Sequence, residues 1–188
     1  MHGRLNPKSG LLDVFQRIYS VEGVFGERLI GSFFFHPDHD HWHIEDIAMY
    51  ELWSVDSENV LDQRILRSRK ASYCLRDAAH LAEDPHPEGW PDFSVYTDCD
   101  NVIQGISPGW MDIYSWDMLG QEIEITGLPD GTYFLITTVN PDWILFESDL
   151  NNNVGTTRFR LTGDGIVILE TSSGLFLTSP AAPPVRKT

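Results

Sequence analysis

Basic residues are scarce in this chain, which has 13 lysines and arginines against 28 aspartates and glutamates and a formal net charge of −15 at pH 7. Proteins that bind nucleic acid need cationic surface to neutralise phosphates, so this balance argues against nucleic acid as a partner. A negative field can instead attract cationic substrates such as amines, or simply serve solubility. The charge therefore disfavours nucleic acid as a partner but does not identify the partner.

Long apolar runs are also absent. No stretch of 18 apolar residues occurs in the 188-residue chain, so the sequence predicts no membrane-spanning helix. The first ten residues hold no apolar segment of the kind that a secretory signal needs. Hydrophobic residues make up 41% of the chain, which is ordinary for one globular domain of this length.

Cysteine is the third scarce feature, with Cys74 and Cys99 as the only two. They are too far apart in sequence for a CxxC site. In an exported protein they would form one disulfide, whose loop of about 25 residues is worth about 3 kcal/mol in the chain-entropy model. In a cytosolic protein they would be two buried thiols, and the residues alone leave both readings open.

Alternating and β-branched segments dominate the remaining sequence. We expect strands at residues 24–35, 39–55, 64–75, 122–126, 132–139, 154–162 and 166–169. Residues 11–19 suit a short helix or a strand equally well, and residues 80–94 are expected to form a long loop. The pattern predicts a mainly β fold with an antiparallel β-sandwich core, long loops and little helix.

Three of the seven histidines lie at alternate positions in His39-Asp-His41-Trp-His43. Because the side chains of a strand alternate between its faces, an extended backbone would put all three on one face, about 6.6 Å apart per step. A flat strand spreads them too widely to meet at one ion, so we expect a twist or bulge next to Pro37. Neutral imidazoles bind copper, zinc, iron or nickel, and copper binds most tightly. The spacing predicts a three-histidine metal site with copper as its first candidate.

Neighbouring side chains could complete this site. His36 is a candidate fourth ligand or a group that supports the ligands. Asp38, Asp40 and Glu45 could orient the imidazole rings through the ring nitrogen that does not bind the metal. Zinc held by three histidines and a water molecule is the main alternative on ligand chemistry.

Four segments, taken together, resemble one protein family. They are His39-Asp-His-Trp-His-Ile-Glu-Asp-Ile-Ala-Met-Tyr-Glu-Leu52, Lys70-Ala-Ser-Tyr-Cys-Leu-Arg-Asp77, Gln104-Gly-Ile-Ser-Pro-Gly-Trp-Met-Asp-Ile-Tyr114, and Val139-Asn-Pro141 with Glu147-Ser-Asp-Leu-Asn-Asn-Asn-Val154. In order and content they resemble the catalytic domain of the lysyl oxidases, which are copper amine oxidases with a built-in quinone. The resemblance runs from about residue 15 to residue 163 and indicates a microbial relative.

The resemblance implies a cofactor and its ligands, position by position. The family's lysyl tyrosylquinone is made from a lysine before an Ala-Ser-aromatic-Cys run, here Lys70, and a tyrosine after a Gly-x-Ser-Pro-Gly segment, here Tyr114. The three copper histidines of the family correspond to His39, His41 and His43.

The resemblance also bears on the cysteines and on the domain. Cys74 and Cys99 correspond to two family cysteines, which favours a disulfide and an extracellular or cell-envelope location. The lysyl oxidase-like domain is expected to cover residues 1–178. We expect the family domain to hold one more strand before Leu11, and this chain to lack that strand. The Pro/Ala-rich residues 179–188 are expected to be a disordered tail.

A lysyl oxidase-like enzyme would convert primary amines, including peptidyl lysine, to aldehydes. Molecular oxygen would be the acceptor, and hydrogen peroxide and ammonia would be released. The redox chemistry would belong to the cofactor, while the chain would supply its placement and a base. Asp112 is the candidate base, because an extended backbone would put it on the same face as Tyr114. An aspartate in a loop can equally serve as a turn former or a cap.

Two other functions fit the histidines. One is a non-catalytic β-sandwich module that binds a metal for structure, adhesion or copper storage. The other is a three-histidine zinc hydrolase with Glu45 or Asp46 as its base. Neither gives a reason for Lys70 and Tyr114 to occupy the family's positions, so these two residues favour the amine oxidase.

Overall fold

The computed structural model describes residues 1–20, 23, 25–69, 72–81, 90–115 and 122–173. These ranges contain strands and no helix, arranged in two larger antiparallel sheets and one two-stranded sheet. The mainly β, antiparallel architecture expected from the sequence is confirmed. The chain divides into two compact units, one drawn from Met1–Ile47, Ala71–Glu122 and Asp142–Phe146, the other from Ala48–Lys70, Ile123–Pro141 and Glu147–Thr188.

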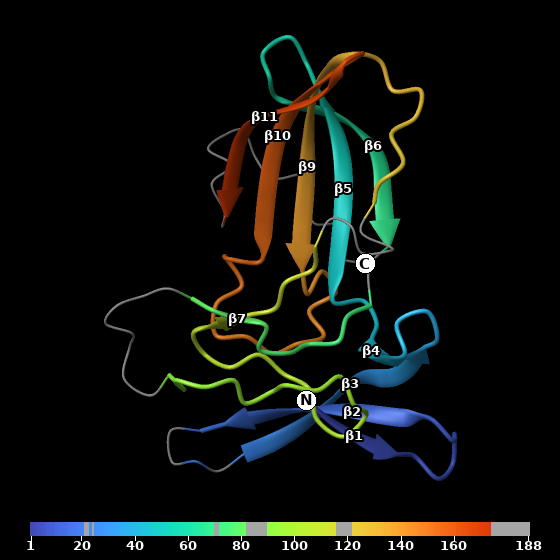
Figure 1. The fold of residues 1–188 in the computed structure, drawn as a ribbon, viewed down its shortest axis with the longest axis vertical. Helices are drawn as coiled ribbons and strands as arrows, with labels where there is room; N and C mark the ends of the chain where they lie inside the picture. The colour runs from blue at the N-terminus through green and yellow to red at the C-terminus, as the bar shows by residue number, and fades with distance from the viewer. Residues whose placement is uncertain (21–22, 24, 70–71, 82–89, 116–121, 174–188) are drawn as a thin grey trace. The chain divides into compact units, whose positions relative to one another are not determined.

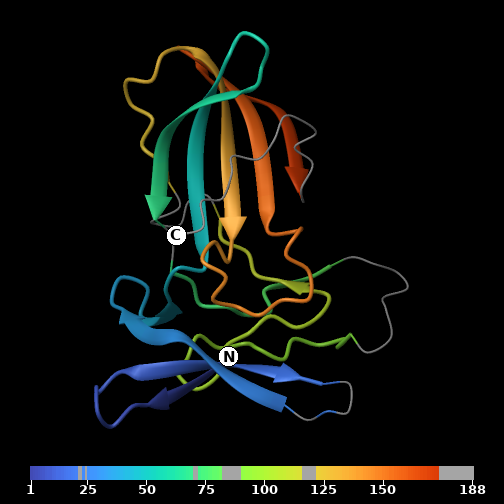
Figure 2. The ribbon, with the colours of Figure 1, turned by 180° about the vertical axis from the view of Figure 1, so that it is seen from behind.

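The first unit contains a four-stranded antiparallel sheet in the order β1-β2-β3-β4. Its strands are β1 (His2–Leu5), β2 (Leu12–Tyr19), β3 (Phe25–His36) and β4 (His41–Ile44). Figure 2 shows β1, β2 and β3, drawn in blue, running side by side. The segment that suited either a helix or a strand is therefore β2, and the chain has a strand before Leu11.

A bulge and a buried cross-strand pair shape this sheet. The register of β2 and β3 shifts between Val14 and Phe15, which leaves Ile30 of β3 as an extra residue. Val14 and Ile30 are both buried. Farther along β3, Phe33 pairs with Ile44 of β4, and both are buried. This apolar contact anchors the end of β4 next to the histidines.

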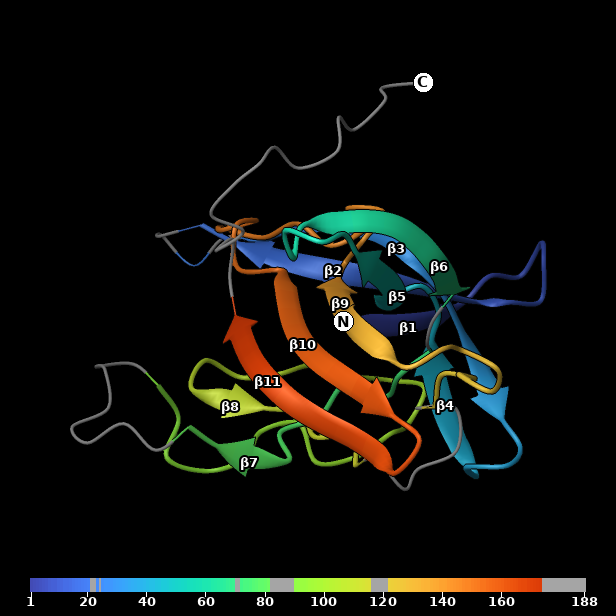
Figure 3. The same cartoon turned by 90° about the horizontal axis from the view of Figure 1, so that it is seen from above.

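The second unit contains a five-stranded antiparallel sheet in the order β11-β10-β9-β5-β6, which Figure 1 shows face on. Its strands are β5 (Ala48–Val55), β6 (Leu61–Arg69), β9 (Gly131–Val139), β10 (Val154–Thr162) and β11 (Gly165–Ser173). Leu52, Tyr133 and Phe159 form its buried cluster. The hairpin β10–β11 curves strongly in Figure 3, as twisted antiparallel strands do.

The remaining two strands, β7 (Ala79–His80) and β8 (Trp110–Met111), form a short ribbon in the first unit. The expected long loop at 80–94 follows β7, and its residues 82–89 lie outside the described ranges. The expected tail at 179–188 lies outside them too.

Two strand predictions are wrong and a third is too long, because β6 ends at Arg69 and residues 72–75 form only a single bridge at Tyr73 instead of the expected end of a strand. Residues 39–55 were expected to form one strand, but the backbone bends at residues 45–47, where Asp46 has a φ of 60°, and β4 and β5 belong to different sheets. Residues 122–126 form no strand, because local hydrogen bonds compete with sheet pairing. The Thr126 amide donates to the Glu124 side chain at 2.7 Å, and the Leu128 amide donates to the Ile125 carbonyl at 3.1 Å.

Within the described ranges, no helix has the length and apolar character needed to cross a membrane.

Candidate metal centre and its surroundings

The β3–β4 hairpin brings four histidines together. His36 ends β3, and His41, its cross-strand partner, begins β4. Between them the chain turns over residues 37–40, where the His39 amide donates to the His36 carbonyl at 3.2 Å and Asp40 has a φ of 56°. Aspartate tolerates this left-handed conformation better than most residues, which suits it to the end of a turn. His39 therefore lies in a turn and not, as expected, on a strand.

Strand pairing sets the direction of the remaining rings. His36 pairs with His41, and Phe34 pairs with His43. Directly opposite residues of an antiparallel pair share a face, and so do alternate residues of one strand. His36, His41 and His43 therefore lie on one face, and the turn folds His39 onto it. This arrangement replaces the twist or bulge in a single strand that the sequence led us to expect.

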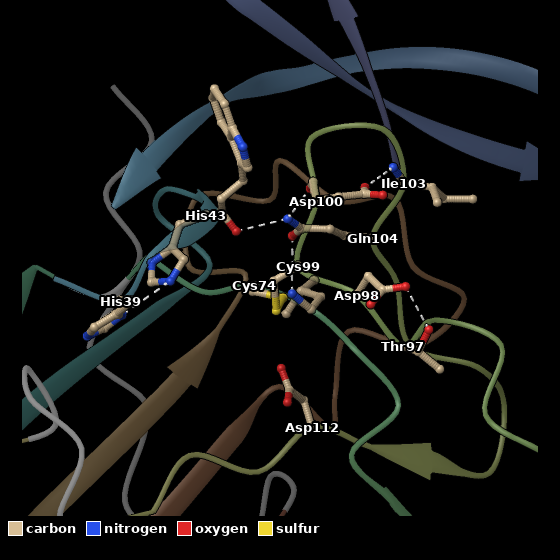
Figure 4. The surroundings of a disulfide bond; sticks show 12 residues. His39, His43, Cys74, Thr97, Asp98, Cys99, Asp100, Ile103, Gln104 and Asp112 are labelled. Carbon is tan, nitrogen blue, oxygen red and sulfur yellow. Dashed lines mark hydrogen bonds between the residues drawn. A yellow bond between two sulfur atoms is a disulfide. The ribbon is translucent and has the colours of Figure 1, made fainter. Parts of the chain in front are cut away.

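The ring geometry separates the four histidines into a tight set and a neighbour. His36, His39 and His43 each offer a nitrogen, and these nitrogens lie within 4.8 Å of one another. The rings of His36 and His39 stack at 4.2 Å, and His39 Nδ1 lies 3.3 Å from His43 Nε2 (Figure 4). The His41 ring is 4.7 Å from that of His43, but His41 is not part of the tight set.

The hydrogen-bond partners and the ionisation of the imidazole rings decide whether this cluster fits a metal. His36 Nδ1 is buried and has no hydrogen-bond partner among the described residues. The pKa of His41 is lowered from 6.5, first by burial and then by the charge of His39. Neutral imidazoles are the form that binds a metal, so the donor set fits a divalent transition metal.

Ser72 is the residue that the sequence reasoning missed. Its Oγ lies 2.9 Å from Nδ1 of His43, a histidine that is 1% exposed. A bond at Nδ1 fixes the ring with its Nε2 directed at His39, as supporting groups of metal sites commonly do. Asp38, Asp40 and Glu45, which were the expected orienting groups, are exposed. Ser72 belongs to the Lys70-Ala-Ser-Tyr-Cys run. Its position in that run, two residues after Lys70, could have identified it from the sequence.

Tyr114 and Asp112 form a second part of the site. The Tyr114 hydroxyl donates to the Cys74 carbonyl, and its ring lies 4.2 Å from that of Tyr73. Burial, and then the charge of Asp112, raises the pKa of Tyr114 well above its ordinary value of 10. The phenol is therefore neutral at physiological pH.

Asp112 is itself half-buried, beside Tyr114 and Arg76. Burial raises its pKa above the ordinary value of 3.8. Its Oδ1 accepts the Ile113 amide at 3.0 Å, while its Oδ2 is buried with no hydrogen-bond partner among the described residues. A half-buried carboxyl group whose pKa is raised is suited to accept a proton.

Cys74 and Cys99 form the disulfide that the sequence comparison favoured, with 5.4 Å between their Cα atoms. The Cys99 carbonyl accepts the Trp42 amide at 3.0 Å, which joins the disulfide to the histidine strand. Lys70, the expected partner of Tyr114 in a cofactor, lies outside the described residues.

Clustered imidazoles, a half-buried tyrosine–aspartate pair and a disulfide in one compact unit define a β protein with a candidate metal site. Sequence comparison makes the class specific. The lysyl oxidase family profile matches residues 26–171, so this chain belongs to the lysyl oxidase family. The matched range includes the four clustered histidines, both cysteines, Lys70, Asp112 and Tyr114.

Individual relatives agree with this assignment. The chain is 32% identical over 135 residues to protein-lysine 6-oxidase of Sus scrofa, covering 70% of this chain and 48% of that protein. It is 32% identical over 135 residues to the Homo sapiens protein of the same name, covering 29% of it. It is 34% identical over 134 residues to lysyl oxidase homolog 2 of Rattus norvegicus, covering 16% of it. The matches thus span less than half of these relatives.

The ring geometry predicts which histidines hold a metal. Replacing His36 or His43 by alanine should weaken Cu(II) binding more than about 100-fold, because loss of a ligand exceeds the 10–100-fold effect of losing a supporting group. Isothermal titration calorimetry of the metal-free protein at pH 7 measures the Cu(II) affinity. The matched control is His80→Gln, which replaces a histidine of β7. Unchanged affinity in His36→Ala together with lost affinity in His41→Ala would show that the ligands follow the sequence motif instead.

Proposed function

We propose that this chain is a copper-dependent, lysyl oxidase-like amine oxidase. It oxidatively deaminates primary amines, including peptidyl lysine, to aldehydes and releases hydrogen peroxide and ammonia. The observation that carries the proposal is that one compact unit, inside the family match, holds both the imidazole cluster and the half-buried Tyr114–Asp112 pair. A metal site alone would need no half-buried tyrosine beside a carboxylate.

The histidines are proposed to hold copper. The sequence motif names His39, His41 and His43, and the geometry adds His36 as a donor. Three imidazole nitrogens suit copper or zinc equally in type, but zinc has no redox chemistry. Oxidation of a tyrosine ring to a quinone requires a redox metal and oxygen, which favours copper.

Tyr114 and Lys70 are proposed to form lysyl tyrosylquinone. The chemistry that this group supplies, once formed, is an electrophilic carbonyl toward an amine and storage of two electrons for oxygen. The chain holds the tyrosine ring in place through the Cys74 carbonyl and the Tyr73 ring. Burial keeps the Tyr114 hydroxyl protonated, so that a separate group has to remove its proton during oxidation.

Asp112 is proposed as the base that removes a proton from the substrate carbon next to the amine. The burial that raises its pKa also leaves Oδ2 without a hydrogen-bond partner in the described part of the chain. The formal net charge of −15 supports a cationic substrate by attracting amines toward the protein. The disulfide supports an extracellular or cell-envelope location, because disulfides persist in oxidising compartments.

Amine oxidation should require Lys70. In copper-loaded, aerated protein supplied with n-butylamine or a lysine-containing peptide, Lys70→Ala should reduce peroxide release at least about 100-fold, because no quinone can form. A peroxidase-coupled assay measures the rate, and copper affinity should stay within about twofold of wild type because no ligand is lost. Lys8→Ala, at an exposed turn lysine, is the matched control.

Two results would contradict this account. Undiminished peroxide release by Lys70→Ala would eliminate the proposed cofactor. A wild-type protein that binds copper but releases no peroxide with either amine would instead support the non-catalytic metal-binding module.

The rate should also depend on the ionisation of Asp112. A base works only when deprotonated, so kcat/KM should fall as pH falls through the pKa of Asp112, which burial places above 3.8. Asp112→Asn should remove this acidic limb and lower the rate about 10²–10⁴-fold. Copper content is measured at each pH so that metal loss is not mistaken for titration. A near-wild-type rate with an unchanged limb in Asp112→Asn, against the exposed Asp98→Asn as control, would assign the base elsewhere.

A further inference from the structure

The Gln104 side chain is fully buried, and both its amide nitrogen and its amide oxygen make hydrogen bonds. It is 0% exposed. Its Nε2 donates to the Trp42 carbonyl at 2.9 Å and to the Asp100 carbonyl at 2.8 Å, while its Oε1 accepts the Leu75 amide at 3.3 Å. Figure 4 shows the Gln104 side chain next to the Cys74–Cys99 disulfide.

The three partners of this amide belong to the segments that build the site. Trp42 lies between His41 and His43 on β4. Leu75 directly follows Cys74, and Asp100 directly follows Cys99. One amide therefore connects the histidine strand to the residues that follow the two cysteines of the disulfide.

Strand β4 needs such a tie because it is the last strand of its sheet. One edge of β4 pairs with β3. On the other edge, Ile44 exchanges two backbone hydrogen bonds with Tyr73, at 2.9 and 3.0 Å, and the Trp42 amide donates to Cys99. The Trp42 carbonyl is the remaining group on this edge, and Gln104 supplies its donor.

Alternate residues of an antiparallel strand direct their backbone groups to the same edge. Trp42 and Ile44 thus fix the second edge of β4, and His43 lies between them. A shift of the backbone at Trp42 would move the ring of His43 away from those of His36 and His39. The hydrogen bonds of this amide go to backbone groups and not to an imidazole, so its effect on the rings passes through the backbone.

We propose that Gln104 is a positioning residue for the metal centre. Its amide takes the place of a neighbouring strand and holds β4 against the disulfide segments, so that the histidine nitrogens keep the spacing that one ion needs. This inference rests on the proposed metal site but not on the proposed oxidase activity.

The first test is copper binding by Gln104→Met, which keeps the side-chain length but removes the donors and the acceptor. Cu(II) affinity should fall about 10-fold, the lower range for a group that supports ligands. The Cu(II) electron paramagnetic resonance spectrum should change from one species to a shifted or mixed signal. Gln104→Glu, which keeps the acceptor for Leu75 and can donate once when protonated, should recover part of the affinity and replaces Gln104→Met if that variant does not fold.

Asp77→Asn is the matched control, because Asp77, like Gln104, is a buried side chain of the same unit that makes several hydrogen bonds. It is 7% exposed and accepts the amides of Val95, Tyr96 and Ser107 and the Ser107 hydroxyl, with no hydrogen bond to β4. This variant should lose thermal stability but keep wild-type copper affinity and spectrum. All variants are compared well below their unfolding temperatures, with the disulfide verified by mass.

The proposal is overturned if Gln104→Met and Gln104→Glu bind copper as wild type does. It is also overturned if Asp77→Asn weakens binding as much as the Gln104 variants do, because the effect would then be general destabilisation. Absence of copper binding by the wild-type protein would remove the metal site itself. Failure of amine oxidation alone, with copper binding intact, would affect only the proposed function.

Discussion

The hydrogen bonds on the second edge of β4 hold the histidine strand where its sheet ends. The strand has only four residues, too few to keep a defined position by pairing along one edge alone. Backbone bonds from Trp42 and Ile44, completed by the Gln104 amide, join it to the segments that carry the disulfide. Because these groups are buried, each would be costly to leave unpaired, which favours a single position for the strand. The position of the histidine cluster therefore depends on the disulfide segments behind β4.

The same framework connects the two parts of the site. Cys74 binds Cys99 covalently, and its carbonyl accepts the hydroxyl of Tyr114. The disulfide segments therefore position both the histidine strand and the tyrosine of the proposed cofactor. Burial then adjusts the chemistry, since it raises the pKa of Tyr114 and of Asp112 alike. A neutral phenol and a carboxylate ready to accept a proton both result from this partial burial.

Part of this arrangement could be predicted from the sequence. Alternation at His41 and His43 predicted a shared face, and the combined motifs predicted the family and the disulfide. The close approach of His36 to His39 and His43 could not be predicted, because His36 joins these rings through cross-strand pairing and a turn. Local rules read residues 39–55 as one strand, since they carry no signal for the change of sheet at Asp46. Gln104 could not be found, because its partner Trp42 is 62 positions away and its partner Leu75 is 29 positions away.

The central claim is that the histidine cluster serves to build an organic cofactor from this chain's own residues. The most direct measurement is a peptide map, by mass spectrometry, of protein loaded with copper and exposed to air, compared with metal-free protein. The account predicts a cross-linked pair of peptides containing Lys70 and Tyr114, together with visible quinone absorbance, only in the copper-loaded sample. Full copper occupancy with both peptides recovered unmodified would contradict it.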